Sequence, residues 1–240
     1  MPYTYVDVAK TIDHSLLQPF LSTAELDKGI ALARAYDVAS VCILPWYLPV
    51  LAERLADCTV VASTVIGFPH GGHLSEIKIA EARRALAQGA AELDMVVNVS
   101  AVKSGEWGLV ASEIREIVAI AHGEGGKVKV IFENAYLTDE EKIRLCLVCG
   151  EIGADWVKTS TGYAPSGATT EDLVLMRKHS PEHVQVKAAG GVRDLDRLLE
   201  VRAIGATRCG ASATAAILDE ARRRLHLEPI EVEAGPVGSY

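Results

Sequence analysis

Lys158 and Lys187 each interrupt a short β-branched run, DWVKTSTG and VQVKAAGG, and are the residues best suited to covalent chemistry. Side chains alternate along a strand, so both lysines should face away from Val157 and Val186 and into one interior. Burial and a second ammonium nearby both lower the pKa of a lysine. The resulting free amine can attack a carbonyl carbon and form an imine, an electron sink for making or breaking a carbon–carbon bond. The pair therefore indicates Schiff-base chemistry.

Acidic residues are predicted to face the same interior. The run ELDMVVN alternates Glu92 and Asp94 with apolar residues, and KVKVIFEN does so with Lys129 and Glu133. Three lysines would then meet three carboxylates, and because unpaired buried charges are costly, the cluster could be neutral. A carboxylate such as Asp94, with an ordered water, could move protons. For Lys129 and Glu92, a fixed salt bridge or extension toward solvent at the strand ends is an equally good interpretation.

Glycine-containing turns follow three consecutive predicted strands and indicate an anion-binding site. Each turn stands where a strand ends and a helix is about to begin. Backbone N–H groups in such turns, with helix dipoles behind them, can cradle a phosphate. Glycines that serve the turns alone are the alternative, but three successive cases favour phosphate. The turns are Thr161-Gly162, Gly190-Gly191 and Gly210-Ala211-Ser212.

Eight β-branched runs alternate with longer amphipathic stretches, which predicts a parallel sheet with helices between its strands. Capping boxes at Ser22 and Thr138 begin two of the helices. Eight such units in 240 residues predict one closed (β/α)8 barrel over residues 1–230, with an open doubly wound sheet as the alternative. Residues 231–240 are predicted to form a mobile tail. The runs are residues 11–16, 39–44, 60–68, 92–99, 127–134, 155–162, 184–191 and 206–212, and glycines 89, 123, 153 and 205 mark helix ends.

Composition excludes several classes of partner. Hydrophobic residues make up 49% and charged residues 23%, which is ordinary for a globular protein. The net charge of −8 argues against nucleic acid or an anionic membrane as the main partner. No run has the length of a signal peptide or a transmembrane helix, and the five cysteines are scattered. We therefore expect a reduced, cytoplasmic protein.

Two groups of cysteines and histidines are of the residue types that bind metals, but their spacing does not fit a metal site. Cys146 and Cys149 lie one turn apart in a predicted helix, and a metal site there would need a second pair or nearby histidines. His14, His70 and His73 lack a clear carboxylate partner, so we expect loop histidines near a polar cavity.

Seven segments together resemble the deoxyribose-phosphate aldolase family over residues 8–225. The resemblance implies that Lys158 is the Schiff-base lysine, that Lys187 perturbs it and shuttles protons, and that Asp94 belongs to the proton relay. Asp13 and Cys42 match residues close to the site, although Cys42 is better explained as a small core residue. The segments are IDHSLLQP, SVCILP, VIGFPHG, ELDMVVNV, WVKTSTGYAPSGAT, VKAAGGVR and RCGAS.

The resemblance also implies a substrate. The implied reaction is the reversible cleavage of 2-deoxy-D-ribose 5-phosphate to acetaldehyde and D-glyceraldehyde 3-phosphate, a step of deoxyribonucleotide catabolism. No cofactor or metal is implied, because the iminium takes the place of a Lewis acid, and a homo-oligomer is expected. The phosphate loops would contain Gly162, Gly190, Gly191 and Ser212, followed by Arg193.

The chain departs from the family pattern in several places. Tyr163 stands where some members have a basic residue, and Ala213 stands where a second serine is common, so the cradle would depend on backbone groups. FENAY, residues 132–136, differs from the commoner acidic–threonine sequence. The terminal Tyr240 could fold over the site, although a free end is the simpler expectation.

Other functions remain open on the residues alone. Another imine-forming lyase, acting on a different aldehyde, would use the same lysines. A non-catalytic barrel that senses a sugar phosphate would explain the glycines but not the interior lysines. A metal-dependent sugar-phosphate epimerase would be sensitive to chelators.

Overall fold

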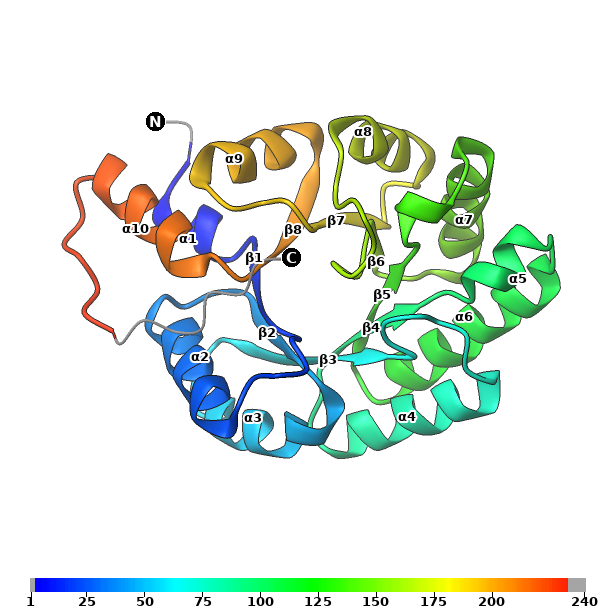
Figure 1. Ribbon diagram of the computed structural model, residues 1–240, viewed down its shortest axis with the longest axis horizontal. Helices are drawn as coiled ribbons and strands as arrows, with labels where there is room; N and C mark the ends of the chain where they lie inside the picture. The colour runs from blue at the N-terminus through cyan, green and yellow to red at the C-terminus, as the bar shows by residue number, and fades with distance from the viewer. Residues whose placement is uncertain (1–2, 233–240) are drawn as a thin grey trace.

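Eight parallel strands close into a barrel in the computed structural model, which describes residues 3–232 (Figure 1). Each strand pairs with the next in chain order, and β1 pairs with β8, so the predicted (β/α)8 barrel is confirmed. Tyr240 and most of the predicted tail lie outside the described residues. The strands are β1 Ile12–Leu16, β2 Ser40–Ile43, β3 Val61–Ile66, β4 Glu92–Val96, β5 Lys127–Ile131, β6 Trp156–Lys158, β7 Gln185–Ala189 and β8 Ala206–Ala211.

Helices surround the barrel on its outside (Figure 1). None of those in residues 3–232 is both long and apolar enough to cross a membrane. Two short 3₁₀ turns, η1 Pro45–Tyr47 and η2 Asn134–Tyr136, lie in loops after β2 and β5. The helices are α1 Tyr5–Ala9, α2 Thr23–Ala35, α3 Leu48–Leu55, α4 Ser75–Ala87, α5 Val99–Lys103, α6 Trp107–Gly123, α7 Asp139–Ile152, α8 Thr170–His179, α9 Leu195–Ile204 and α10 Thr214–Arg224.

The predicted helix signals lie where the helices begin and end. Ser22 caps α2 and Thr138 caps α7, each with the reciprocal glutamate of a capping box. Gly153 and Gly205 end α7 and α9 in the left-handed conformation that a residue without Cβ adopts easily. The cysteine pair is buried in α7, as the helix interpretation predicted, and burial raises the pKa of the Cys146 thiol to about 11.

The strands separate apolar from charged side chains. Leu93, Met95, Val128 and Val130 point outward and are fully buried in the core between barrel and helices. Their neighbours along β4 and β5 point into the barrel, where acidic and basic side chains are also buried. Because all strands run in the same direction, their carboxyl ends and the loops that follow meet at one end of the barrel.

Candidate active site

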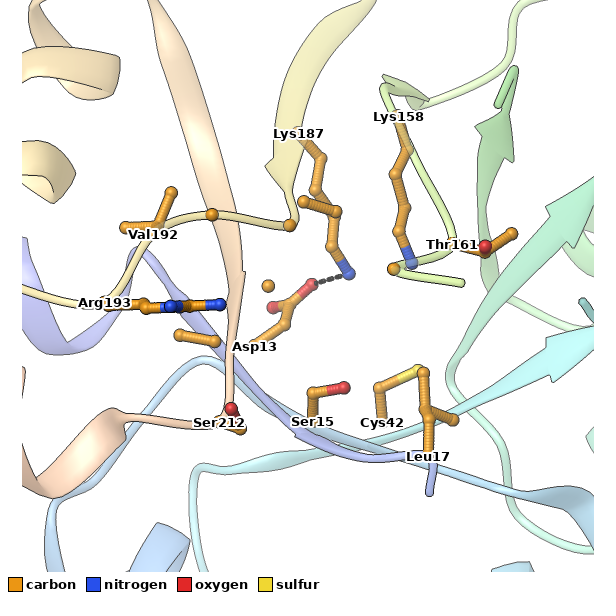
Figure 2. Close-up of a pocket in the computed structure, with 16 residues that line it drawn as sticks. Asp13, Ser15, Leu17, Cys42, Lys158, Thr161, Lys187, Val192, Arg193 and Ser212 are labelled. Carbon is orange, nitrogen blue, oxygen red and sulfur yellow. Dashed lines mark ion pairs between the residues drawn. The ribbon is translucent and has the colours of Figure 1, made fainter. Parts of the chain in front are cut away.

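The predicted lysine pair meets Asp94 inside the barrel. Lys158 on β6 and Lys187 on β7 are register partners on adjacent strands. Their Nζ atoms lie 2.7 and 2.8 Å from the same atom, Oδ2 of Asp94 on β4. The two lysines are only 3% and 1% exposed, and Asp94 is fully buried. Figure 2 shows both lysine side chains extending side by side toward the same space.

The surroundings of the two amines move their pKa values in opposite directions. Burial lowers the pKa of Lys158, and the ammonium of Lys187 lowers it further, against the attraction of Asp94. Burial also disfavours the charge on Lys187, but Asp13 and Asp94 outweigh it and raise the pKa of that amine. Lys187 therefore holds its proton more firmly, and Lys158 is the amine that loses its proton more readily.

A second layer of charges lies below this pair. Asp13 on β1 forms an ion pair with Lys187 at 2.5 Å, drawn in Figure 2, and another with Arg208 on β8 at 2.5 Å. Arg208 also binds Glu92 at 2.8 Å, and Lys129 lies 2.5 Å from Glu92. The predicted interior position of Lys129 and Glu92 is confirmed, and they form a buried salt bridge.

Arg208 was missed in the sequence, although a signal was present. In the run ATRCGA, Cys209 packs into the core and Arg208 precedes it, so alternation alone would have turned the guanidinium inward. Burial by itself would disfavour its charge, but Asp13 and Glu92 raise the pKa of the guanidinium further above its ordinary value.

The prediction that Glu133 joins the lysines was wrong. Strand β5 ends at Ile131, so alternation no longer applies two residues later. Glu133 has a left-handed backbone (φ 60°, ψ 62°), and its carboxylate accepts hydrogen bonds from the Thr161 backbone N–H, at 3.1 Å, and from the Thr161 hydroxyl. The same hydroxyl accepts a hydrogen bond from the Tyr163 N–H. Glu133 thus orders the loop that follows β6.

A pocket opens above the lysines at the carboxyl ends of the strands. Asp94 lies beneath it, and all other predicted site residues line it. One wall is apolar, because Leu17 and Cys42 pack with Val65 there. Burial raises the pKa of the Cys42 thiol, which suits a small neutral wall residue. The lining includes Asp13, Lys158, Thr161, Gly162, Lys187, Gly190, Gly191, Arg193 and Ser212 (Figure 2).

The glycine turns form the other side of this pocket. Gly162, Gly190 and Gly191 all have left-handed backbones, with φ of 94°, 82° and 85°. A Cβ on Gly190 would lie 2.8 Å from the Cα of Gly167, so only glycine allows the two loops to approach this closely. Helix α9 is already capped by the side chain of Asp194, whereas α10, beside Ser212, has no side-chain cap. The dipole available to an anion is therefore that of α10.

The histidines lie apart from the lysines. His14 faces the helices, with Nδ1 2.8 Å from Thr214 Oγ1, and burial lowers its pKa to about 4. His73 is exposed, and His70 lines a separate pocket with Glu133 and Tyr163. Within residues 3–232, no cluster of three histidine, cysteine or acidic side chains has the arrangement of a metal site.

Known proteins resemble this chain along nearly its whole length. Residues 8–219 match the family described as DeoC/LacD family aldolase. A protein of Rhodopirellula baltica named deoxyribose-phosphate aldolase is 61% identical over 238 residues, which covers 99% of each chain. A protein of the same name from Caldanaerobacter subterraneus is 46% identical, and the match covers 91% of this chain and 95% of that one. The tetrameric deoxyribose phosphate aldolase of Aeropyrum pernix has a TM-score of 0.84 and 30% identity, with 92% of this chain and 93% of that one covered.

Proposed function

Because the chain belongs to the DeoC/LacD family of aldolases, we propose that it reversibly cleaves 2-deoxy-D-ribose 5-phosphate to acetaldehyde and D-glyceraldehyde 3-phosphate through an imine on Lys158. The observation that carries the proposal is the Lys158 amine itself. It is buried, its pKa is lowered, and it stands at the floor of a pocket next to a second lysine and a carboxylate. A lowered pKa increases the fraction of free amine, which is the nucleophilic form.

In the cleavage direction, Lys158 attacks the aldehyde carbon C1 of the open-chain sugar. Loss of water from the carbinolamine gives a protonated imine, and Lys187 is placed to supply the proton for the departing hydroxide. The C3 hydroxyl then loses its proton, through an ordered water, to the group formed by Asp94 and Lys187. The C2–C3 bond breaks, its electron pair moves into the iminium to give an enamine, and D-glyceraldehyde 3-phosphate leaves.

The remaining two-carbon unit completes the cycle. The enamine takes up at C2 the proton that the group formed by Asp94 and Lys187 received from the C3 hydroxyl, and becomes the protonated imine of acetaldehyde. Water adds to that imine and releases acetaldehyde together with the free Lys158 amine, and the proton set free returns to the same group. The charged intermediates stay next to Asp94, whose carboxylate already binds both lysines and can stabilise a positive iminium.

The two sides of the pocket fit the two ends of this substrate. The apolar wall of Leu17 and Cys42 suits the carbon atoms of the acetaldehyde unit. The glycine turns and the uncapped start of α10 suit the phosphate, with Arg193 and Ser212 in the same lining. Asp13 lines the pocket too, but its carboxylate is paired with Lys187 and Arg208, so its proposed part is to hold Lys187.

Borohydride trapping tests the catalytic assignment. Acetaldehyde and borohydride should leave a two-carbon adduct that peptide mass mapping locates on Lys158, and Lys158→Leu should abolish it. Lys103→Leu, which changes a half-exposed lysine paired with Glu141, is the matched control and should keep the adduct. An adduct on Lys129 or Lys187 in the unmodified protein would overturn the assignment.

Substrate comparison separates the alternatives. Removing the 5-phosphate from deoxyribose should lower kcat/KM strongly, whereas equal turnover would leave an imine-forming lyase for another aldehyde. Loss of activity in a chelator would point instead to a metal-dependent reaction.

We also propose a cytoplasmic homo-oligomer. The tetrameric relative from Aeropyrum pernix supports the assembly, and exposed apolar side chains such as Phe20, Trp46 and Leu74 offer contact surface. The five cysteines are all free, as is usual in a reducing compartment. Light scattering on the purified protein measures the assembly, and a monomer at micromolar concentration would contradict it.

A further inference from the structure

The buried charges inside the barrel do not balance. Within residues 3–232, this interior cluster contains four basic side chains and three acidic ones. All seven are nearly inaccessible to water, and Arg208, the most open, has a side chain only 14% exposed. The cations are Lys129, Lys158, Lys187 and Arg208, and the anions are Asp13, Glu92 and Asp94.

The contacts show which cation is held least firmly. Lys129 pairs with Glu92 and Asp94, and Lys187 pairs with Asp13 and Asp94. Arg208 pairs with Asp13 and Glu92. Of the described ion pairs, Lys158 takes part in only one, with the Asp94 oxygen that it shares with Lys187.

We propose that Arg208 is a positioning residue that keeps Lys158 in its reactive free-amine form by occupying Asp13 and Glu92 with a permanent positive charge. This inference rests on the proposed imine chemistry of Lys158. An arginine does not release its proton in a protein, so the excess proton of the cluster must leave a lysine. Lys158 is that lysine, because its ammonium has a single, shared carboxylate.

Arg208 lies where its positive charge is poorly screened by water. Its Cζ lies 5.1 Å from the centre of the Trp156 ring, and the Nζ of Lys129 lies 5.7 Å from the same ring. Trp156 is itself 4% exposed and directly precedes Val157 and Lys158 in β6. The indole therefore limits water at this level of the barrel, so the charge of Arg208 is poorly screened.

The other titratable groups near Lys158 do not restore the balance. Cys42 on β2 has a pKa raised by burial and stays neutral. Glu133, after β5, is a further acidic group that interacts electrostatically with Lys158, but burial raises its pKa, Thr161 holds its carboxylate by hydrogen bonds, and it takes part in none of the described ion pairs. Arg193, in the loop after β7, lines the pocket as a further cation but is exposed to solvent.

The pH dependence of imine formation tests this role. Acetaldehyde is mixed with the full-length protein across a pH series, and samples are quenched into borohydride at one fixed pH and weighed by intact mass. The midpoint of the rise in rate with pH then reports the loss of the Lys158 proton. Removing a unit charge about 10 Å away, at an effective dielectric constant of about 20, should move this midpoint by about one pH unit.

Four variants are expected to move the pH midpoint of imine formation in different directions. Arg208→Met removes a cation, so Lys158 should keep its proton longer and the midpoint should rise. Glu92→Gln removes an anion, so the midpoint should fall. The double variant, Arg208→Met with Glu92→Gln, again has one more cation than anions, so its midpoint should lie close to that of the unmodified protein. Arg208→Lys keeps the charge if its new amine stays protonated between Asp13 and Glu92, and it should shift the midpoint least.

The outcomes are distinguishable. A purely structural role for Arg208 would lower the rate at every pH without moving the midpoint, and that result would overturn the inference. If Arg208→Met fails to fold, Glu92→Gln decides, since an unmoved or raised midpoint would contradict the charge argument. If the unmodified protein forms no adduct at any pH, the proposed function fails first.

Discussion

Replacing Lys187 with methionine should shift the pH dependence of imine formation to higher pH, and by more than Arg208→Met does, because Lys187 is closer to Lys158. The Nζ atoms of Lys158 and Lys187 lie 2.7 and 2.8 Å from one oxygen of Asp94, so they are no more than about 5.5 Å apart. At that separation and an effective dielectric constant of about 20, two ammonium groups repel by about 3 kcal/mol, or about two pKa units.

The pH dependence should shift upward because Lys187→Met removes the ammonium group next to Lys158. Without Lys187, the ammonium of Lys158 no longer shares the Asp94 oxygen with another cation, so its pKa rises. At a neutral pH below that pKa, the fraction of free amine falls about 100-fold, and the rate of imine formation falls with it. The rise in rate should occur about two pH units higher than in the unmodified protein, and its plateau should be lower because Lys187 no longer donates a proton.

The assay is the rate of acetaldehyde adduct formation across pH, with Lys187→Arg as the control that keeps the charge. In the arginine variant the rate will drop if the longer side chain packs poorly, but the midpoint should stay near its original value. An equal loss of rate at all pH values for Lys187→Met would refute the electrostatic reasoning and leave Lys187 acting only as a proton donor. An unchanged profile would refute both roles.

Three further changes test the surrounding structure. Asp94→Asn leaves three buried amines without their common carboxylate and should lower the free energy of unfolding in urea by about 3–5 kcal/mol; a loss below about 1 kcal/mol would contradict the ion-pair geometry. Gly190→Ala forces a Cβ against Gly167 and an unfavourable left-handed backbone, so KM for deoxyribose 5-phosphate should rise at least tenfold while the acetaldehyde adduct still forms. Lys78→Met breaks the buried Lys78–Glu113 pair between α4 and α6, and should cost about 3–5 kcal/mol of stability without moving the pH midpoint of imine formation.

The sequence predicted the parts of the site that depend on local order along one strand. Lys158, Lys187 and Asp94 alternate with core residues in their own strands, so their inward direction follows from the period of two alone. The glycine turns were recognisable for a similar reason, because they directly follow their strands. The same local argument failed for Glu133, which lies beyond the end of β5 with a left-handed backbone that no alternation predicts.

The barrel, the burial of the lysines and the side of each strand on which they lie could be predicted from the sequence, because all three depend on residues close together in the chain. Which charges meet depends on the closed barrel. Asp13 and Arg208 are 195 positions apart and become neighbours only because closure of the barrel pairs β1 with β8. Lys158 and Lys187 are register partners, but the order of the strands around the ring places β7 one strand nearer to β1 than β6 is, so Lys187 also binds Asp13 while Lys158 only shares Asp94. The reactivity of Lys158 depends on that difference.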